Sequence, residues 1–359
     1  MGEQAYWLGF HLVPGIGATR AARLVEHFGT LEAAWHADGV ALRAAGLNDR
    51  AIDSLAAARQ RIALDRELAR LDQHGVTIVT LADDEYPRLL REISSPPLVL
   101  YVRGDLGSVD RPAVAVVGTR RSSSYGREMA RRLSTDLAAA GVTVVSGLAR
   151  GIDGAAHQAA LDAGGRTVAV FGCGLDTIYP PEHRRLAEAV VACGAIVSEF
   201  PLGTPPDATN FPVRNRLISG LSLGVIVVEA PRRSGALITA NFAADQGRTV
   251  YAVPGAVVSP GSEGPLQLLR DGATLVTNGE DVLADLDLVQ RQVTQETRQM
   301  LPTSREEVAV LERLDGQPRH IDEVALDTGL PVSRLSALLL ELQLKGFVRN
   351  VGAQHYVRA

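Results

Sequence analysis

Short apolar runs alternate with helical patterns through the middle of the chain, from residue 76 to residue 287. Each run is a few residues long, rich in β-branched side chains, and followed by glycine or a small polar residue. Strands that are apolar along their whole length are buried on both faces, as in parallel sheets covered by helices. The sequence therefore predicts an α/β fold whose strands lie at residues 114–117, 142–145, 167–171, 195–197, 225–228, 250–253 and 274–276.

Residues 1–75 have a different pattern and form a separate helical domain in our prediction. Apolar residues recur at close to helical spacing, and glycines divide the segment into several short helices. The turn at Val13–Gly17, followed by Arg20 and Arg23, looks like a helix–hairpin–helix in a SAM-like domain. Two interpretations of this turn stay open: it binds a phosphate through free backbone N–H groups, or it only packs two helices.

The C-terminal part also reads as a separate domain. Residues 288–302 are polar without apolar periodicity, which predicts a linker. Residues 303–359 predict three helices followed by a β-ribbon, the winged-helix pattern. This stretch carries seven Arg and Lys against eight Asp and Glu, which gives a net charge of −1. This charge disfavours recognition of a DNA groove and favours a domain that contacts another protein.

The charge balance limits how this chain could bind an anion. The formal net charge is −5, so a nucleic-acid site would have to come from local clustering of cations. Lys345 is the one lysine, and anions would therefore meet arginine, whose guanidinium suits phosphate geometry. Cys173 and Cys193 lack metal-ligand spacing, and no signal peptide or apolar span is visible, so we expect a cytoplasmic protein without metal or cofactor.

The loops that follow the predicted strands are rich in glycine, serine and arginine. Ligands of parallel α/β sheets bind outside the carboxyl ends of the strands, where these loops should converge. Glycine or serine directly before a helix lets backbone N–H groups approach an anion, and arginine adds bidentate contacts. We therefore expect a phosphate pocket built from Gly118, Arg120, Ser146, Gly147, Arg214, Arg216, Ser234 and Gly235.

Known nucleotide and metal motifs do not explain these loops. The first strand is followed by Gly118-Thr119-Arg120 and not by G-x-G-x-x-G, and no Walker A sequence occurs. We interpret Asp153 as a helix N-cap. We interpret His157 as a packing or hydrogen-bonding residue or as part of a pocket wall, because no second metal ligand stands at a suitable spacing.

The strand-end strings together resemble the DNA-processing protein A family (DprA/Smf). The matching strings are Val117–Arg120 with Ser123 and Tyr125-Gly126, Ser146–Ala149 with Gly151–Asp153 and Ala156-His157, Gly174–Asp176 with Tyr179-Pro180, Ser198–Pro201 with Gly203, Phe211-Pro212 with Arg214–Arg216, Val227–Ala230 with Ser234–Ala240, and Gly247-Arg248 with Ala252–Gly255. They cover most of residues 76–287 in order. One departure is the segment 207–210, which lacks the basic residue that often precedes the Phe-Pro string, and we expect modest DNA affinity from it.

The resemblance implies an extended Rossmann fold that binds single-stranded DNA and is not an enzyme. It further implies a homodimer that loads the RecA recombinase onto incoming DNA during natural transformation and protects the strand, with a single-strand-binding protein as a further partner. Arg120 would contact the DNA backbone, and Phe211, Arg214, Asn215 and Arg216 would line the DNA pocket. Thr119 joins the expected site as part of the first matching string.

One rival hypothesis is an enzyme, a nucleotide phosphoribohydrolase like the LOG proteins, which share a related architecture. That chemistry typically uses a Pro-Gly-Gly-x-Gly-Thr loop with a following glutamate. The corresponding loop here, Arg233–Thr239, contains no acid. Glu229, in the strand before it, is expected to be a structural hydrogen-bond acceptor.

Overall fold

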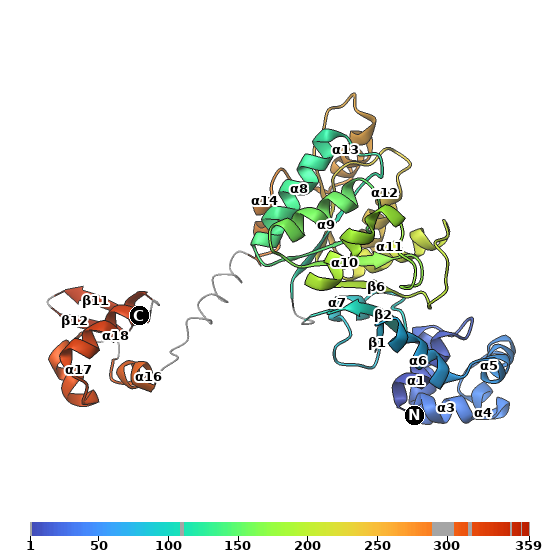
Figure 1. Cartoon of the computed structure of the whole chain (residues 1–359), viewed down its shortest axis with the longest axis horizontal. Helices are drawn as coiled ribbons and strands as arrows, with labels where there is room; N and C mark the ends of the chain where they lie inside the picture. Colours follow the sequence, from blue (N-terminus) through green and yellow to red (C-terminus); the bar gives the residue numbers. More distant parts are fainter. Residues whose placement is uncertain are drawn as a thin grey trace. The chain divides into compact units, whose positions relative to one another are not determined.

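The computed structural model describes residues 2–107, 111–288, 305–314, 318–344, 347–352 and 354–358. The chain divides into two compact units, Met1–Leu286 and Asp287–Ala359, each of which is described by itself (Figure 1). Most of the expected linker, residues 288–302, lies outside the described residues.

A nine-stranded sheet forms the centre of the first unit, in the order β1-β2-β6-β5-β4-β3-β7-β8-β9. Its strands are β1 (Thr77–Thr80), β2 (Val99–Gly104), β3 (Ala113–Val117), β4 (Thr143–Ser146), β5 (Thr167–Phe171), β6 (Ala195–Ser198), β7 (Gly224–Val227), β8 (Thr249–Ala252) and β9 (Thr274–Leu275). The strands from β3 to β9 pair in parallel, which confirms the predicted parallel sheet. The sequence prediction missed β1 and β2, which add an antiparallel edge beside β6.

Helices cover both faces of this sheet, because successive strand residues point to opposite sides. The helices that follow β1 are α7 (Arg88–Arg91), α8 (Ser124–Ala139), α9 (Ile152–Asp162), α10 (Arg184–Cys193), α11 (Asn210–Gly220), α12 (Gly235–Asp245), α13 (Glu263–Arg270) and α14 (Gly279–Asp285), with short 3₁₀ turns at Pro181–His183 and Pro260–Ser262. On β5, Val168 and Val170 join the core that includes α7, α11 and α12, whereas Ala169 and Phe171 join the core that includes α10.

The order of the strands reverses at β3. From β3 the chain first builds β4, β5 and β6 on one side, and then crosses over to β7, β8 and β9 on the other. Such a reversal opens a crevice at the carboxyl ends of the central strands, because the flanking loops diverge there. This Rossmann-like arrangement places the loops after β3, β4, β6 and β7 around one point.

Six helices precede the sheet, where the sequence predicts a helical segment divided into several short helices. They are α1 (Glu3–His11), α2 (Ala18–Phe28), α3 (Leu31–His36), α4 (Gly39–Ala44), α5 (Asp49–Arg61) and α6 (Leu64–Gln73). Their apolar side chains share one buried core with β2, β5 and α10. The imidazole Nε2 of His11 donates to the Glu199 carbonyl oxygen at 2.8 Å, which joins α1 to the segment after β6.

The second unit has the winged-helix pattern predicted for it. It contains α16 (Arg305–Glu312), β10 (Arg319–His320), α17 (Ile321–Thr328), α18 (Val332–Leu344), β11 (Val348–Gly352) and β12 (His355–Arg358). Its three strands form a small sheet in the order β10-β12-β11, and its helices enclose a separate apolar core. Across the described parts of both units, we find no helix with the length and apolar character that a membrane crossing requires.

Candidate nucleic-acid interface

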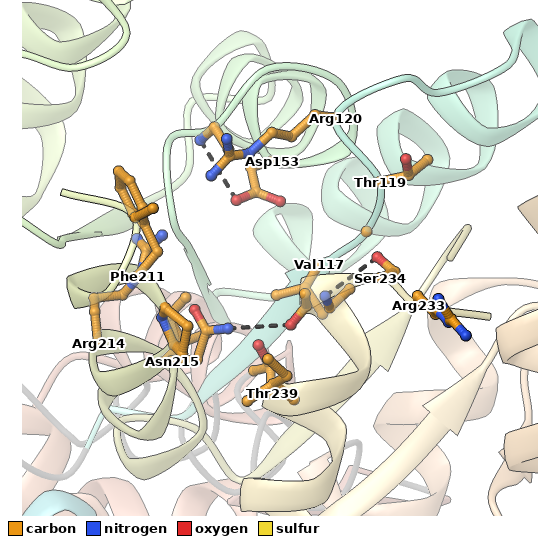
Figure 2. A pocket seen from close by; sticks show the side chains of 18 of the residues that line it. Val117, Thr119, Arg120, Asp153, Phe211, Arg214, Asn215, Arg233, Ser234 and Thr239 are labelled. Carbon is orange, nitrogen blue, oxygen red and sulfur yellow. Dashed lines mark hydrogen bonds between the residues drawn. The ribbon is translucent and has the colours of Figure 1, made fainter. Parts of the chain in front are cut away.

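A pocket of about 720 Å³ opens at the carboxyl ends of the central strands, where the strand order reverses. Figure 2 shows Phe211, Arg214 and Asn215 of α11 facing Ser234 and Arg233, which precede α12, with Thr119 and Arg120 above them. The full lining is Val117–Arg121, Ala149, Asp153, Tyr179, Pro206, Ala208, Phe211, Pro212, Arg214, Asn215, Ile218, Pro231, Arg233–Ala236, Ile238 and Thr239. The pocket therefore collects residues from five segments that are far apart in sequence.

Phe211 is an aromatic platform among cations. The guanidinium of Arg120 lies 5.2 Å from the ring centroid, and that of Arg214 lies 5.7 Å away. The ring of Tyr179 is tilted beside it, with centroids 5.7 Å apart. Gly172 leaves the necessary room, because a Cβ at that position would lie 2.9 Å from Phe211 Cδ1. An unpaired base can stack on such a ring while guanidinium groups hold phosphates.

Arg214 is buried beneath this platform, with 4% of its surface exposed. Its Nη1 donates to the carbonyl oxygens of Gly147, at 3.0 Å, and Val170. The pKa of Arg214 is lowered to about 10, chiefly by burial; Asp153 opposes this shift and the charge of Arg120 adds to it. Arg214 therefore stays charged at neutral pH, and it holds α11 against the ends of β4 and β5.

The carboxylate of Asp153 organises the loop before α9. It accepts hydrogen bonds from the backbone N–H groups of Gly147, at 3.2 Å, and Ala149, at 3.4 Å. The expectation that Asp153 is a helix N-cap is wrong: the cap is Gly151, at φ +79°, and Asp153 is the second residue of the helix. Burial raises the pKa of Asp153, while Arg214 and the backbone N–H groups lower it.

The N-terminus of α12 forms the opposite wall of the pocket. Ser234 caps the helix by accepting from the Ala236 N–H at 3.3 Å. Asn215 Nδ2 donates to the Gly235 carbonyl oxygen at 3.1 Å and so fixes α11 relative to α12. A Cβ at Gly235 would meet no atom within 4 Å, so the backbone here is open to an approaching ligand.

Glu229 fixes the loop after β3, which carries Arg120, through hydrogen bonds. The Thr119 N–H donates to the Glu229 carbonyl oxygen at 2.7 Å. The Glu229 carboxylate accepts from the Ser123 N–H at 2.9 Å and from the Ser123 hydroxyl. A Cβ at Gly118 would lie 2.9 Å from the Glu229 carbonyl oxygen, so close contact requires glycine there. The prediction that Glu229 is a structural hydrogen-bond acceptor is confirmed.

Three of the expected site residues do not line the pocket. Ser146 is buried, and its hydroxyl donates to the Val116 carbonyl oxygen at 2.7 Å. Gly147 lies behind the pocket, where its carbonyl accepts from Arg214. Arg216 forms an ion pair with Glu199, in which both side chains are largely buried. The other eight line it: Gly118, Thr119, Arg120, Phe211, Arg214, Asn215, Ser234 and Gly235.

The pocket lining also contains residues that the expected site did not include, chiefly Arg121, Arg233 and Tyr179, the last of which belongs to a matching string. Their sequence positions offered a signal, since Arg121 follows Arg120 and Arg233 directly precedes Ser234 and Gly235. Segment 207–210 contributes only Ala208 to the lining and no cation.

Cations at this pocket are free of carboxylate partners. None of the ion pairs within the described ranges involves Arg120, Arg121 or Arg233, whereas many other arginines are paired. Asp153 is the one carboxylate in the lining, and it is already engaged by N–H groups. Unpaired positive charges at one crevice attract anions even on a net negative chain.

His157 is a buried hydrogen-bonding residue, as predicted. Its Nδ1 lies 2.6 Å from the Thr167 hydroxyl, which itself donates to the Val144 carbonyl oxygen at 2.7 Å. Nδ1 is therefore the donor, and burial lowers the pKa of His157 to about 3. No group of three or more potential metal ligands occurs among the residues that the structure describes.

Fold and site together define a class of protein: a Rossmann-like domain with an arginine- and aromatic-lined crevice, followed by a winged helix. Comparison with family models supports the same class of protein for both parts of the chain. Residues 77–287 match DNA recombination-mediator protein A, and residues 294–354 match the DprA winged helix domain. The chain belongs to the DprA/Smf family.

Relatives in several bacteria extend over most of the chain. The Smf protein of Synechocystis is 36% identical over 99% of both chains, and that of Escherichia coli is 41% identical over 88% of this chain and 86% of its own. The crystal structure of DNA processing protein A from Streptococcus pneumoniae covers 78% of this chain and 97% of its own, with 34% identity and a TM-score of 0.67. A structure of the Helicobacter pylori protein, described for its single-stranded DNA binding mode, covers 59% of this chain and 95% of its own, with 30% identity and a TM-score of 0.54.

Proposed function

We propose that this protein binds single-stranded DNA in the crevice at β3 and acts as a recombination mediator, not as an enzyme. One observation carries the proposal: the guanidinium groups of Arg120 and Arg214 both lie within 6 Å of the Phe211 ring centroid, and Arg121 and Arg233, which have no ion-pair partner in the described residues, line the same pocket. The Helicobacter pylori relative, described for its single-stranded DNA binding mode, supports the same ligand.

The geometry favours a single strand over a duplex. The half-buried Phe211 ring offers stacking only to a base whose face is free, and in a duplex both faces are covered by neighbouring bases. The guanidinium groups around the ring suit the phosphates on either side of such a base. No residue of the lining reads a base edge in an evident way, so we expect binding with little sequence preference.

Membership of the family supports the mediator role. We propose that a homodimer of this protein loads RecA onto the bound strand in the cytoplasm during natural transformation, protects that strand, and meets single-strand-binding protein there. RecA ATPase on DNA coated with single-strand-binding protein measures this role. The proposal predicts faster RecA assembly when the protein is added, and an unchanged lag would contradict it.

The phosphoribohydrolase alternative finds little support in the pocket. Glu229, its candidate acid, is 4% exposed and already accepts two hydrogen bonds from Ser123. Asp153 is occupied by backbone N–H groups. No free pair of acid and base is evident in the described lining. Release of free base from a nucleoside monophosphate, abolished in Glu229→Gln, would restore the enzyme hypothesis.

The direct test is the binding of fluorescently labelled oligo-dT, measured by anisotropy, with a duplex of equal length as competitor. The wild type should bind the strand, and the duplex should compete weakly. Arg120→Ala should weaken binding, because it removes a cation beside Phe211. Arg131→Ala is the matched control, since that exposed arginine is paired with Glu128 and lies outside the pocket. Equal binding by Arg120→Ala would show that the DNA site lies elsewhere.

A further inference from the structure

A second cavity, of about 440 Å³, adjoins the DNA crevice and is not explained by the proposed site. It is lined by Arg120, Arg121, Ser122, Arg127, Gly151, Gly154, Ala155 and His183. Arg120 and Arg121 line both cavities, so the second begins where the first ends. Its remaining walls come from the first turns of α8 and α9 and from the turn after Pro180.

The lining of this second cavity is cationic. It contains three arginines and a histidine, and no carboxylate. Carboxylates close by are used elsewhere: Glu182 pairs with Arg150, and Glu128 pairs with Arg131. None of the ion pairs in the described part of the chain includes Arg127. Like charges gathered without a counter-charge repel one another, and an anion in the cavity removes that repulsion.

Two of these side chains are held in place by neutral partners. The Arg127 Nη1 donates to the Ser122 carbonyl oxygen at 2.7 Å, and Nη2 lies 3.4 Å from the Ser124 hydroxyl. The His183 Nδ1 lies 3.0 Å from the Leu148 carbonyl oxygen, and it must be the donor because a carbonyl oxygen only accepts. These bonds fix the orientation of both groups, they leave the charge of Arg127 without a counter-charge, and a guanidinium has further N–H donors for a ligand.

Glycine keeps the floor of this second cavity open. A Cβ at Gly154 would lie 2.8 Å from His183 Cε1, so a side chain there would displace the imidazole. Gly151, at φ +79°, allows the backbone to approach the loop that carries Arg120, where a Cβ would lie 2.3 Å from the Thr119 carbonyl oxygen. The backbones of the two loops therefore lie close enough together for both to contact a small anion.

We propose that this cavity is a second phosphate subsite of the DNA-binding path, which holds a neighbouring phosphodiester of the strand whose base lies at Phe211. The strand runs from the Phe211 crevice across Arg120 and Arg121 to Arg127 and His183. This inference rests on the proposed function, and it adds the path of the strand along the protein and a minimum strand length. Strands too short to reach Arg127 use the first cavity alone.

The test compares oligo-dT strands of different length, from about 3 to about 20 nucleotides, which brackets the range of known single-strand site sizes. Arg127→Gln removes the charge and keeps an amide that can donate to Ser122. We expect it to weaken binding of long strands and to reduce the salt slope by about 0.7, the value for one phosphate contact on single strands. Binding of the shortest strands should be unchanged, and Arg127→Lys should recover most of the slope.

Two controls separate this inference from the function on which it rests. Arg132→Ala removes an exposed arginine of the same helix that lines neither cavity, and it should bind every strand as the wild type does. Arg120→Ala should weaken strands of every length. If Arg127→Gln matches the wild type on long strands while Arg120→Ala is weak, the second subsite is refuted and the crevice is retained. If Arg127→Gln weakens all lengths equally, a separate subsite is also refuted, and if the wild type binds no strand, both proposals fail.

Discussion

Arg214 and Arg216 lie two residues apart on α11 and have different roles. Both stand in one string and resemble one another chemically, yet only Arg214 lines the pocket. Residues two apart on an α-helix point about 200° apart, so they cannot share a face. Arg214 therefore lies under Phe211, and Arg216 meets Glu199. The sequence predicts that cations gather here, but the rotation of α11 decides which of them face the ligand.

Phe211 yields the prediction at the residue scale. Replacement of Phe211 by Leu removes the stacking surface and should weaken oligo-dT binding by about 1–3 kcal/mol, the range for one base on an aromatic ring. Phe211→Trp should keep most of the affinity. Anisotropy titrations measure both, with Phe28→Leu as a control outside the pocket. Equal affinity of Phe211→Leu and the wild type would remove the ring from the DNA site.

The sequence predicts those helices and strands whose position depends on the local pattern of apolar residues. Seven parallel strands were found because continuous β-branched runs between helices have few other interpretations. The strands β1 and β2 were missed because their place depends on antiparallel pairing of β2 with β6, about 90 residues later in the chain. The cap of α9 was misassigned because a glycine at φ +79° begins the helix, and sequence favoured the polar Asp153.

Two histidines, the half-buried His11 of α1 and the buried His157 of α9, make the stability of the fold depend on pH. Burial lowers the pKa of His11 to about 4 and that of His157 to about 3, so each imidazole is neutral in the folded state near neutral pH. The unfolded chain takes up protons below about pH 6.5 that the folded chain does not. The free energy of unfolding should therefore fall as pH is lowered from about 6.5 toward about 4, by about 1.4 kcal/mol per pH unit for each histidine.

Urea denaturation at a series of pH values measures this slope. His157→Gln should make it shallower, because one of the two protons is no longer taken up on unfolding. Gln158→Ala, at an exposed position of α9, changes no titratable group and should leave the slope as it is in the wild type. A slope that is equally steep in His157→Gln would mean that His157 is not the neutral buried group described.

At the scale of the whole molecule, charge is distributed so that a net negative chain presents a cationic crevice. The formal net charge is −5, yet Arg120, Arg121, Arg127 and Arg233 line the two adjoining cavities without carboxylate partners in the described chain. Composition could not predict this, because it averages over surfaces that the fold separates. The sequences of the strand-end loops could predict a cationic crevice, because a parallel sheet brings these loops to one edge.

The two-unit division predicts that DNA binding is a property of the first unit. Every residue of both cavities lies within Met1–Leu286, and the winged-helix segment 303–359 has a net charge of −1. A shortened protein that ends at residue 286 should therefore bind oligo-dT with the affinity and salt slope of the full chain. Anisotropy titrations of both proteins compare them, and a marked loss on shortening would assign DNA contacts to the winged helix.

The most direct test of the central claim is the salt dependence of oligo-dT binding by the wild type and by the double variant Arg120→Ala/Arg233→Ala. Both arginines line the crevice on opposite sides and have no ion-pair partner in the described residues. If each holds a phosphate, the slope of log K against log salt should become shallower by about 1.4, or about 0.7 for each contact, and affinity at low salt should fall. A double variant with the wild-type slope and affinity would contradict the account, because DNA would then not follow the crevice at β3.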